Sequence, residues 1–158
     1  MKVTYLCPHC RGAINARNNI ILSAKTSTKN VGLILLHEEI GNYTSALSSS
    51  LTVEEDEVVD LFCPICHESL NIPKKDSLAK YIRIDDSLKE SYIIISRKYG
   101  EKITFKVDEK KQVETYGEKI SRFIDPEWFL HQPFMKSRTR FLKKLNSLPI
   151  FIKLTLIC

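Results

Sequence analysis

The sequence predicts a mainly β protein in which short helical segments are confined to the C-terminal part. Runs rich in β-branched and aromatic residues recur along the chain, and Gly, Asn and Asp residues between them mark turns. An apolar fraction of 43% over 158 residues is typical of a globular protein. The expected order is a β domain, a small antiparallel β-meander and a basic, partly helical end.

The first expected domain, residues 1–72, is a β domain that encloses a long insert. Two β-prone runs, at 3–6 and 58–62, each lead into a Cys-Pro-x-Cys tetrapeptide, and we expect these runs to form neighbouring strands. Turn residues separate further short strands that are predicted within the insert, at 20–25, 31–37 and 43–47.

The two tetrapeptides, CPHC and CPIC, contain four of the five cysteines of the chain. Thiolates with two residues between them can bind the same ion when the backbone turns tightly, and a proline after the first Cys sets the φ angle that such a turn needs. Two pairs together supply the closed tetrahedral shell of four thiolates that many structural zinc sites have. The predicted metal ligands are Cys7, Cys10, Cys63 and Cys66.

The separation of the two pairs is unusually long, because 52 residues lie between Cys10 and Cys63. In compact zinc sites, about 15–20 residues separate the two cysteine pairs. Lengthening such a loop threefold costs only about 1 kcal/mol of closure entropy, whereas structural zinc binds with an apparent free energy of about 10–16 kcal/mol. A shared metal site is therefore expected, provided that the insert folds so that its ends meet.

The motifs CPHC and CPIC resemble the knuckles of the zinc-ribbon and rubredoxin-like class, in which two such knuckles on adjacent β-hairpins hold one metal ion. The resemblance covers roughly residues 1–72. It implies a zinc-ribbon-like domain with one structural Zn²⁺, in a class whose members serve as structural or docking modules in transcription, translation and enzyme assembly. The sequence departs from the class after the second Cys of each motif, where a glycine is common and Arg11 and His67 stand here.

Other interpretations of the cysteines stay open. The pairs could be redox-active dithiols, although a thioredoxin-like pair begins a helix and helical periodicity is absent after both motifs. Unligated thiols and a zinc site that releases its ion on oxidation are further alternatives, and iron suits a four-thiolate shell as well as zinc does. His9 and His67 are expected to be exposed knuckle residues, since four thiolates already fill the shell. No catalytic constellation emerges, so we do not expect an enzyme.

The second expected domain, residues 73–130, is the β-meander. Its strands are predicted at 80–85, 91–96, 102–108 and 112–116, followed by a short helical segment that restarts at Asp125 and Pro126. Aromatic residues alternate with Lys and Arg in these strands, and cross-strand packing is favoured over stacking on nucleic-acid bases.

The third expected part, residues 131–158, is a basic and apolar tail. It holds six of the 24 Lys and Arg residues and none of the 19 Asp and Glu residues of the chain. Apolar residues between Phe141 and Leu148 follow helical spacing with basic residues opposite. Three interpretations stay open: a helix and strand packed on the body, an arm that binds a membrane surface or a nucleic acid, and a non-native terminus.

The net charge of +5 belongs to this tail, because residues 1–130 hold 18 basic and 19 acidic side chains. A nearly neutral body is a poor platform for nucleic acid, whose non-specific binding depends on Lys and Arg, so a protein partner is favoured. The N-terminal sequence lacks the apolar run of a secretory signal, and no segment is long and apolar enough to span a bilayer. We therefore expect a cytoplasmic zinc-binding protein that acts as a metal-stabilised binding or scaffold module.

Overall fold

The computed structural model describes residues 2–75 and 77–118, and this part of the chain contains ten strands and no helix. The prediction of a mainly β protein is confirmed. The helical segments predicted beyond residue 118, and the tail at 131–158, lie outside the described residues. Within the described ranges there is accordingly no helix that could cross a membrane.

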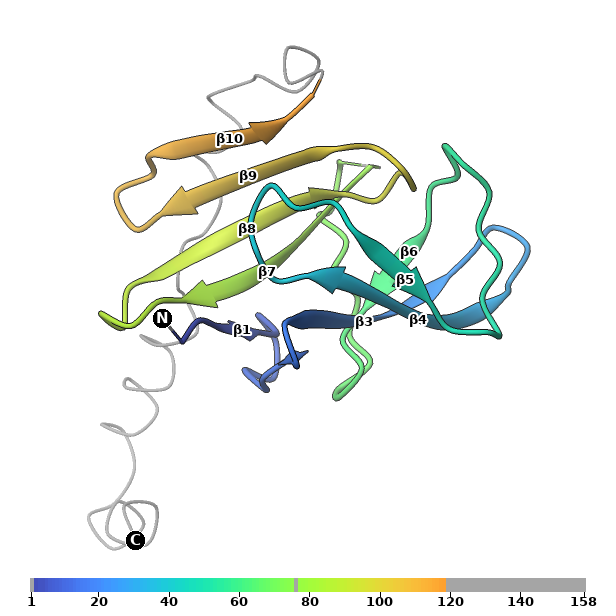
Figure 1. The fold of residues 1–158 in the computed structure, drawn as a ribbon, viewed down its shortest axis with the longest axis horizontal. Coiled ribbons are helices and arrows are strands. Elements are labelled where there is room, and N and C mark those ends of the chain that lie inside the picture. The colour runs from blue at the N-terminus through green and yellow to red at the C-terminus, as the bar shows by residue number, and fades with distance from the viewer. Residues whose placement is uncertain (1, 76, 119–158) are drawn as a thin grey trace, which may run out of the picture. The chain divides into compact units, whose positions relative to one another are not determined.

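Five strands form an antiparallel sheet that we call the meander sheet (Figure 1). Four of them follow one another in sequence and in space, as the β-meander prediction requires. The fifth strand, β1, comes from the start of the chain and pairs with β7, so that Thr4 lies opposite Ile84. The strand order is β1 (Thr4–Leu6), β7 (Leu78–Ile84), β8 (Glu90–Ser96), β9 (Ile103–Asp108) and β10 (Val113–Gly117).

The other five strands form a second antiparallel sheet, which we call the insert sheet. Its longest members, β3 and β4, pair over seven residues, and a tight turn with positive φ at Arg17 and Asn18 joins β2 to β3. Such turns match the twist of a two-stranded hairpin. The strands are β2 (Asn15–Ala16), β3 (Asn19–Lys25), β4 (Val31–His37), β5 (Ser45–Leu47) and β6 (Asp60–Phe62).

The two runs that lead into the cysteine motifs do not pair with each other, which corrects the expectation of neighbouring strands. Strand β1 pairs with β7 in the meander sheet, and β6 pairs with β3 in the insert sheet. The cysteine motifs therefore follow strands of two different sheets. The predicted parts 1–72 and 73–130 also share a sheet, and all described residues belong to one compact unit, Met1–Asp125.

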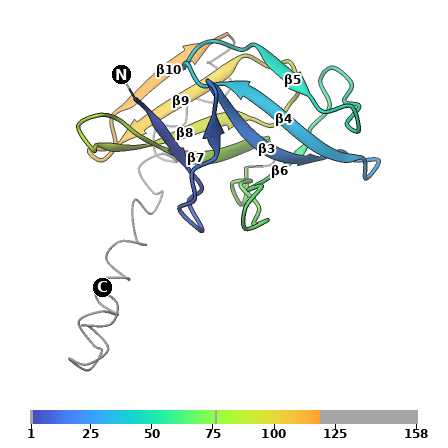
Figure 2. The ribbon, with the colours of Figure 1, turned by 60° about the horizontal axis from the view of Figure 1, so that its bottom comes forward.

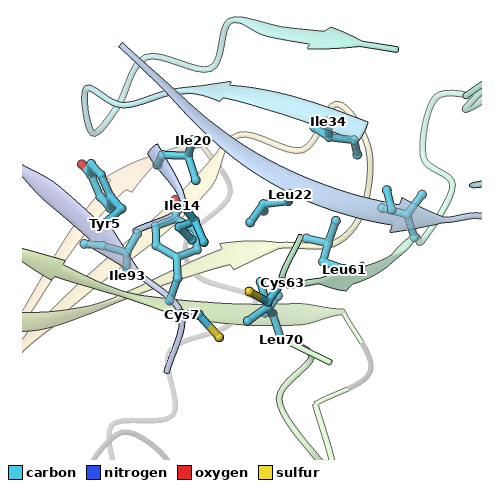
Figure 3. Close-up of a cluster of buried hydrophobic side chains, with 14 of the residues drawn as sticks. Tyr5, Cys7, Ile14, Ile20, Leu22, Ile34, Leu61, Cys63, Leu70 and Ile93 are labelled. Carbon is cyan, nitrogen blue, oxygen red and sulfur yellow. The ribbon is translucent and has the colours of Figure 1, made fainter. Parts of the chain in front are cut away.

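Figure 2 shows the ribbons of the two sheets, and the hydrophobic core contains buried side chains from both of them. Every second residue of β3 is buried, which places Ile20, Leu22 and Ala24 in this core. The meander sheet contributes Tyr81 and Ile93 from the other side. Figure 3 shows that this cluster extends to two cysteines of the motifs, which contribute buried sulfur to the same core.

Candidate metal centre

The first cysteine motif folds into a tight knuckle after β1. The Cys7 carbonyl oxygen accepts a hydrogen bond from the Arg11 N–H (2.9 Å), and the Cys7 N–H donates to the Gly12 carbonyl oxygen (3.0 Å). Two further N–H groups point at sulfur, because His9 N lies 3.3 Å from Cys7 Sγ and Gly12 N lies 3.4 Å from Cys10 Sγ. Hydrogen bonds of this kind stabilise a thiolate more than a thiol, because the acceptor is charged.

The second motif repeats this geometry after β6. The Cys63 carbonyl oxygen accepts from the His67 N–H and the Cys63 N–H donates to the Glu68 carbonyl oxygen, both over 3.0 Å. The Ile65 N–H points at Cys63 Sγ over 3.3 Å. Two segments with different residues at most positions thus fold into the same knuckle.

Arg11 and His67 occupy the positions at which the zinc-ribbon class commonly has glycine, and both have left-handed backbone angles. Their φ values are 59° and 64°. A side chain in this region costs about 1–2 kcal/mol, because its Cβ atom crowds the following carbonyl oxygen. The knuckle conformation is therefore kept without glycine, at the cost of local strain.

The four sulfur atoms of the motifs converge although the pairs lie far apart in sequence. Cys7 Sγ lies 3.8 Å from Cys66 Sγ, and Cys10 Sγ lies 3.9 Å from Cys63 Sγ. All four lie within 4.8 Å of one another. Zn–S bonds of about 2.3 Å in a tetrahedral shell place sulfur atoms about 3.8 Å apart, whereas a disulfide requires about 2.05 Å. The residues present fit a four-coordinate metal ion.

The four thiols differ in their surroundings. Cys7 and Cys63 are fully buried, Cys66 is half-buried and Cys10 is exposed. Burial raises the pKa of Cys7 to about 12 and also raises the pKa of Cys63, while the backbone N–H of Glu68 lowers the pKa of Cys66. The buried thiols are thus protonated at neutral pH in the metal-free chain, and metal binding has to displace their protons.

The two knuckles also contact each other directly. The His9 ring nitrogen Nε2 lies 2.9 Å from the Ser69 carbonyl oxygen, beyond the second knuckle. A Cβ atom added to Gly12 would come within 2.7 Å of Ile65 Cδ1, so the second knuckle lies close against the first at this point. His9 and His67 are exposed, and neither belongs to the group of four converging ligands.

An ion pair connects the first knuckle to the meander sheet. The Arg11 guanidinium binds the carboxylate of Glu90 at the start of β8, and the Glu90 side chain is only 7% exposed. Sequence reasoning missed this pair because its members are 79 residues apart. The only sequence signal for this ion pair was Arg11 itself, a large basic residue at a position where the knuckle favours glycine.

Replacing His67 by glycine is expected to stabilise the metal-loaded protein by about 0.5–1 kcal/mol. The substitution removes the strain of a left-handed side chain, and the larger entropy of glycine in the unfolded chain offsets part of the gain. Urea unfolding in the presence of zinc measures this difference.

Arg11→Gly is the matched control. It relieves the same strain but leaves the buried Glu90 carboxylate without its partner, so we expect a net loss of about 1–2 kcal/mol. Equal effects of the two substitutions would contradict the role assigned to the ion pair.

Comparison of this chain with protein-family models, with curated proteins and with solved structures gave no match. The chemistry of the site is therefore inferred from its geometry. Four protein ligands complete a tetrahedral shell and leave no position for a substrate or an activated water. Such an arrangement suits a structural ion.

Proposed function

We propose that the chain is a zinc-binding protein in which Cys7, Cys10, Cys63 and Cys66 hold one structural Zn²⁺. The observation that carries this proposal is the convergence of four sulfur atoms at separations of 3.8 and 3.9 Å between the pairs. Two knuckles with N–H groups aimed at sulfur agree with a zinc-ribbon-like site. The ion would hold the ends of β1 and β6 together and so connect the two sheets at this edge of the core.

The biological role that we propose is that of a metal-stabilised binding or scaffold module with a protein partner. A closed metal shell does not support catalysis by the ion. Tyr81 and Phe105 of the meander sheet are buried, which disfavours base stacking by these aromatic residues. A cytoplasmic location suits the proposal, because thiols are kept reduced there and remain able to bind metal.

The main alternative is a redox-active dithiol protein. In a thioredoxin-like site the cysteine pair begins a helix, and in the described part of the chain both pairs lie in β-knuckles followed by extended segments. The structure therefore favours metal binding over dithiol exchange. A redox-switched zinc site and iron in place of zinc remain compatible with four converging thiolates.

Zinc content combined with a thiol count tests the proposal. Protein purified under reducing conditions is expected to hold one zinc ion per chain and to protect the four thiols of Cys7, Cys10, Cys63 and Cys66 from thiol reagents until a chelator is added. Loading with Co²⁺ is expected to give the absorption of a tetrahedral thiolate site. Absence of bound metal together with free reaction of these four thiols would overturn the proposal, and an intense visible colour in the purified protein would indicate iron.

A further inference from the structure

A cavity of about 330 Å³ is lined by residues of both sheets. Ile20 of the insert sheet and Ile93 and Ile95 of the meander sheet contribute apolar walls. The loop 38–44, between β4 and β5, and the loop 97–102, between β8 and β9, line its sides. None of the four cysteines of the metal centre lines the cavity, so it is a separate site.

The inner part of the cavity suits the hydrocarbon part of an organic molecule. Natural ligand sites begin at about 300 Å³, and their walls are mainly apolar, so this cavity has room for about two fused six-membered rings. Ile20 and Ile93 are 2% and 1% exposed. The Tyr5 and Tyr81 rings add an aromatic wall, in which they meet edge to face with centroids 5.7 Å apart.

The mouth of the cavity carries charged side chains. Glu39, Glu55 and Lys102 line the cavity and are exposed to solvent. A polar group of a ligand would lie at this mouth, since burying it against the apolar walls would cost free energy. The cavity therefore suits an amphipathic molecule, and the charges of the lining decide which polar group it carries.

Two of the three Lys and Arg side chains in the lining are already paired with acids outside it. Arg97 Nη2 lies 2.5 Å from Asp60 Oδ1, and Lys98 Nζ lies 3.4 Å from Asp56 Oδ1. Neither of these two aspartates lines the cavity. The Lys102 ammonium group is the third, and it forms no ion pair within the described ranges of the chain.

Two further side chains of the lining are left out of the charge balance. The Glu101 carboxylate accepts a hydrogen bond from the Ser96 hydroxyl over 2.5 Å, so it is already bound within the wall. The His37 ring accepts a hydrogen bond from the Glu39 backbone N–H through Nδ1 over 3.1 Å and is counted as neutral.

The remaining carboxylates outnumber the remaining cation. Glu38, Glu39 and Glu55 line the cavity and form no ion pair with a described residue. Three carboxylates against the one Lys102 ammonium group leave a surplus of two negative charges. Because a cleft lined by a surplus of one sign attracts the opposite charge, the mouth favours a cationic group.

We propose that this cavity binds an amphipathic amine, with a mainly apolar body of about bicyclic size inside and one protonated amino group at the mouth near Glu38, Glu39 and Glu55. The apolar walls remove the body from water, and the surplus of carboxylates selects the charge. This site is independent of the metal proposal, since no metal ligand takes part in it.

Two probes of the same shape and different charge test the site. The full chain, loaded with zinc, is titrated with 1-naphthylmethylamine, which is protonated at neutral pH, and with the uncharged 1-naphthalenemethanol, and NMR follows the amide shifts of the cavity residues. We expect both probes to bind, and the amine to bind about 2- to 10-fold more tightly at low salt. This difference is expected to shrink in about 1 M salt, where the screening length falls to about 3 Å.

Glu55→Gln tests the role of the carboxylates. It is expected to lower the affinity for the amine about 1.5- to 5-fold, the range of one exposed ion pair, and to leave the affinity for the alcohol unchanged. Glu54→Gln is the matched control, because Glu54 is also exposed but does not line the cavity. The proposal is overturned when both variants lower the affinity for the amine equally, or when the amine binds no more tightly than the alcohol at low salt.

Ile95→Phe tests whether the probes lie in the cavity. It enlarges a side chain in the wall and is expected to weaken both probes alike, and dispersed amide signals verify that the variant is folded. Leu33→Phe, at an exposed position outside the lining, is expected to leave both affinities unchanged. The proposal is overturned when neither probe shifts the cavity amides up to its solubility limit, or when folded Ile95→Phe binds both probes as tightly as the parent protein does.

Discussion

Cys63→Ser is expected to abolish stoichiometric zinc binding and to leave the chain largely unfolded. A structural zinc ion contributes about 10–16 kcal/mol of apparent binding free energy, which matches or exceeds the whole stability of about 5–15 kcal/mol that is typical of a domain. Cys63 is fully buried between the sheets, so its loss also removes a ligand that solvent cannot readily replace. Metal analysis and the dispersion of amide NMR signals measure the two effects.

Cys158→Ser is the matched control for this prediction. It removes the one cysteine outside the two motifs and is expected to leave zinc content and folding unchanged. A Cys63→Ser protein that retains one tightly bound zinc ion and a dispersed spectrum would contradict the four-thiolate assignment. Equal loss of zinc in both variants would contradict it too.

The metal ligands could be predicted from sequence because ligand chemistry is local. Two thiols at a spacing of three, with proline between them, specify a knuckle almost without reference to the rest of the chain. The structure brings all four predicted cysteines together, including Cys10 and Cys63 across 52 intervening residues. The sequence also indicated the left-handed φ angle of His67, because His67 occupies the position at which a zinc-ribbon knuckle commonly has glycine.

Strand pairing could be predicted only in part. The β-prone run at 20–25 locates β3, and the order of the meander follows from its short turns. Alternation defines the face that a strand buries but not the strand beside it. The pairing of β1 with β7 joins residues about 80 positions apart, and no local pattern encodes it. Strand β2 was missed because Asn15 and Ala16 carry no alternating apolar signal.

The cavity of about 330 Å³, lined by residues of both sheets, was beyond prediction for the same reason. Its sides depend on where the loops 38–44 and 97–102, which belong to different sheets, come to lie. Sequence reasoning placed Tyr43 at the start of a predicted strand, whereas β5 begins at Ser45. A site formed by residues from distant parts of the sequence can be found only once the three-dimensional structure is known.

Leu22→Ala is expected to destabilise the zinc-loaded protein by about 2–5 kcal/mol, the range for a large-to-small change in a packed core. The Leu22 side chain is 0% exposed and lies in the cluster that also contains Cys7 and Cys63. The alanine leaves a cavity beside the residues that position the metal ligands. Urea unfolding at fixed free zinc concentration gives the change in the free energy of unfolding.

Leu33→Ala is the control, because Leu33 lies on the adjacent strand of the same sheet and is 39% exposed on the opposite face. Its loss is expected to cost less than about 1 kcal/mol, since only part of the side chain leaves water on folding. The two variants make the same chemical change, so their difference isolates burial between the sheets. Equal losses of unfolding free energy in the two variants would mean that the core between the sheets contributes little to stability. The insert sheet would then be held to the meander sheet chiefly by the zinc centre.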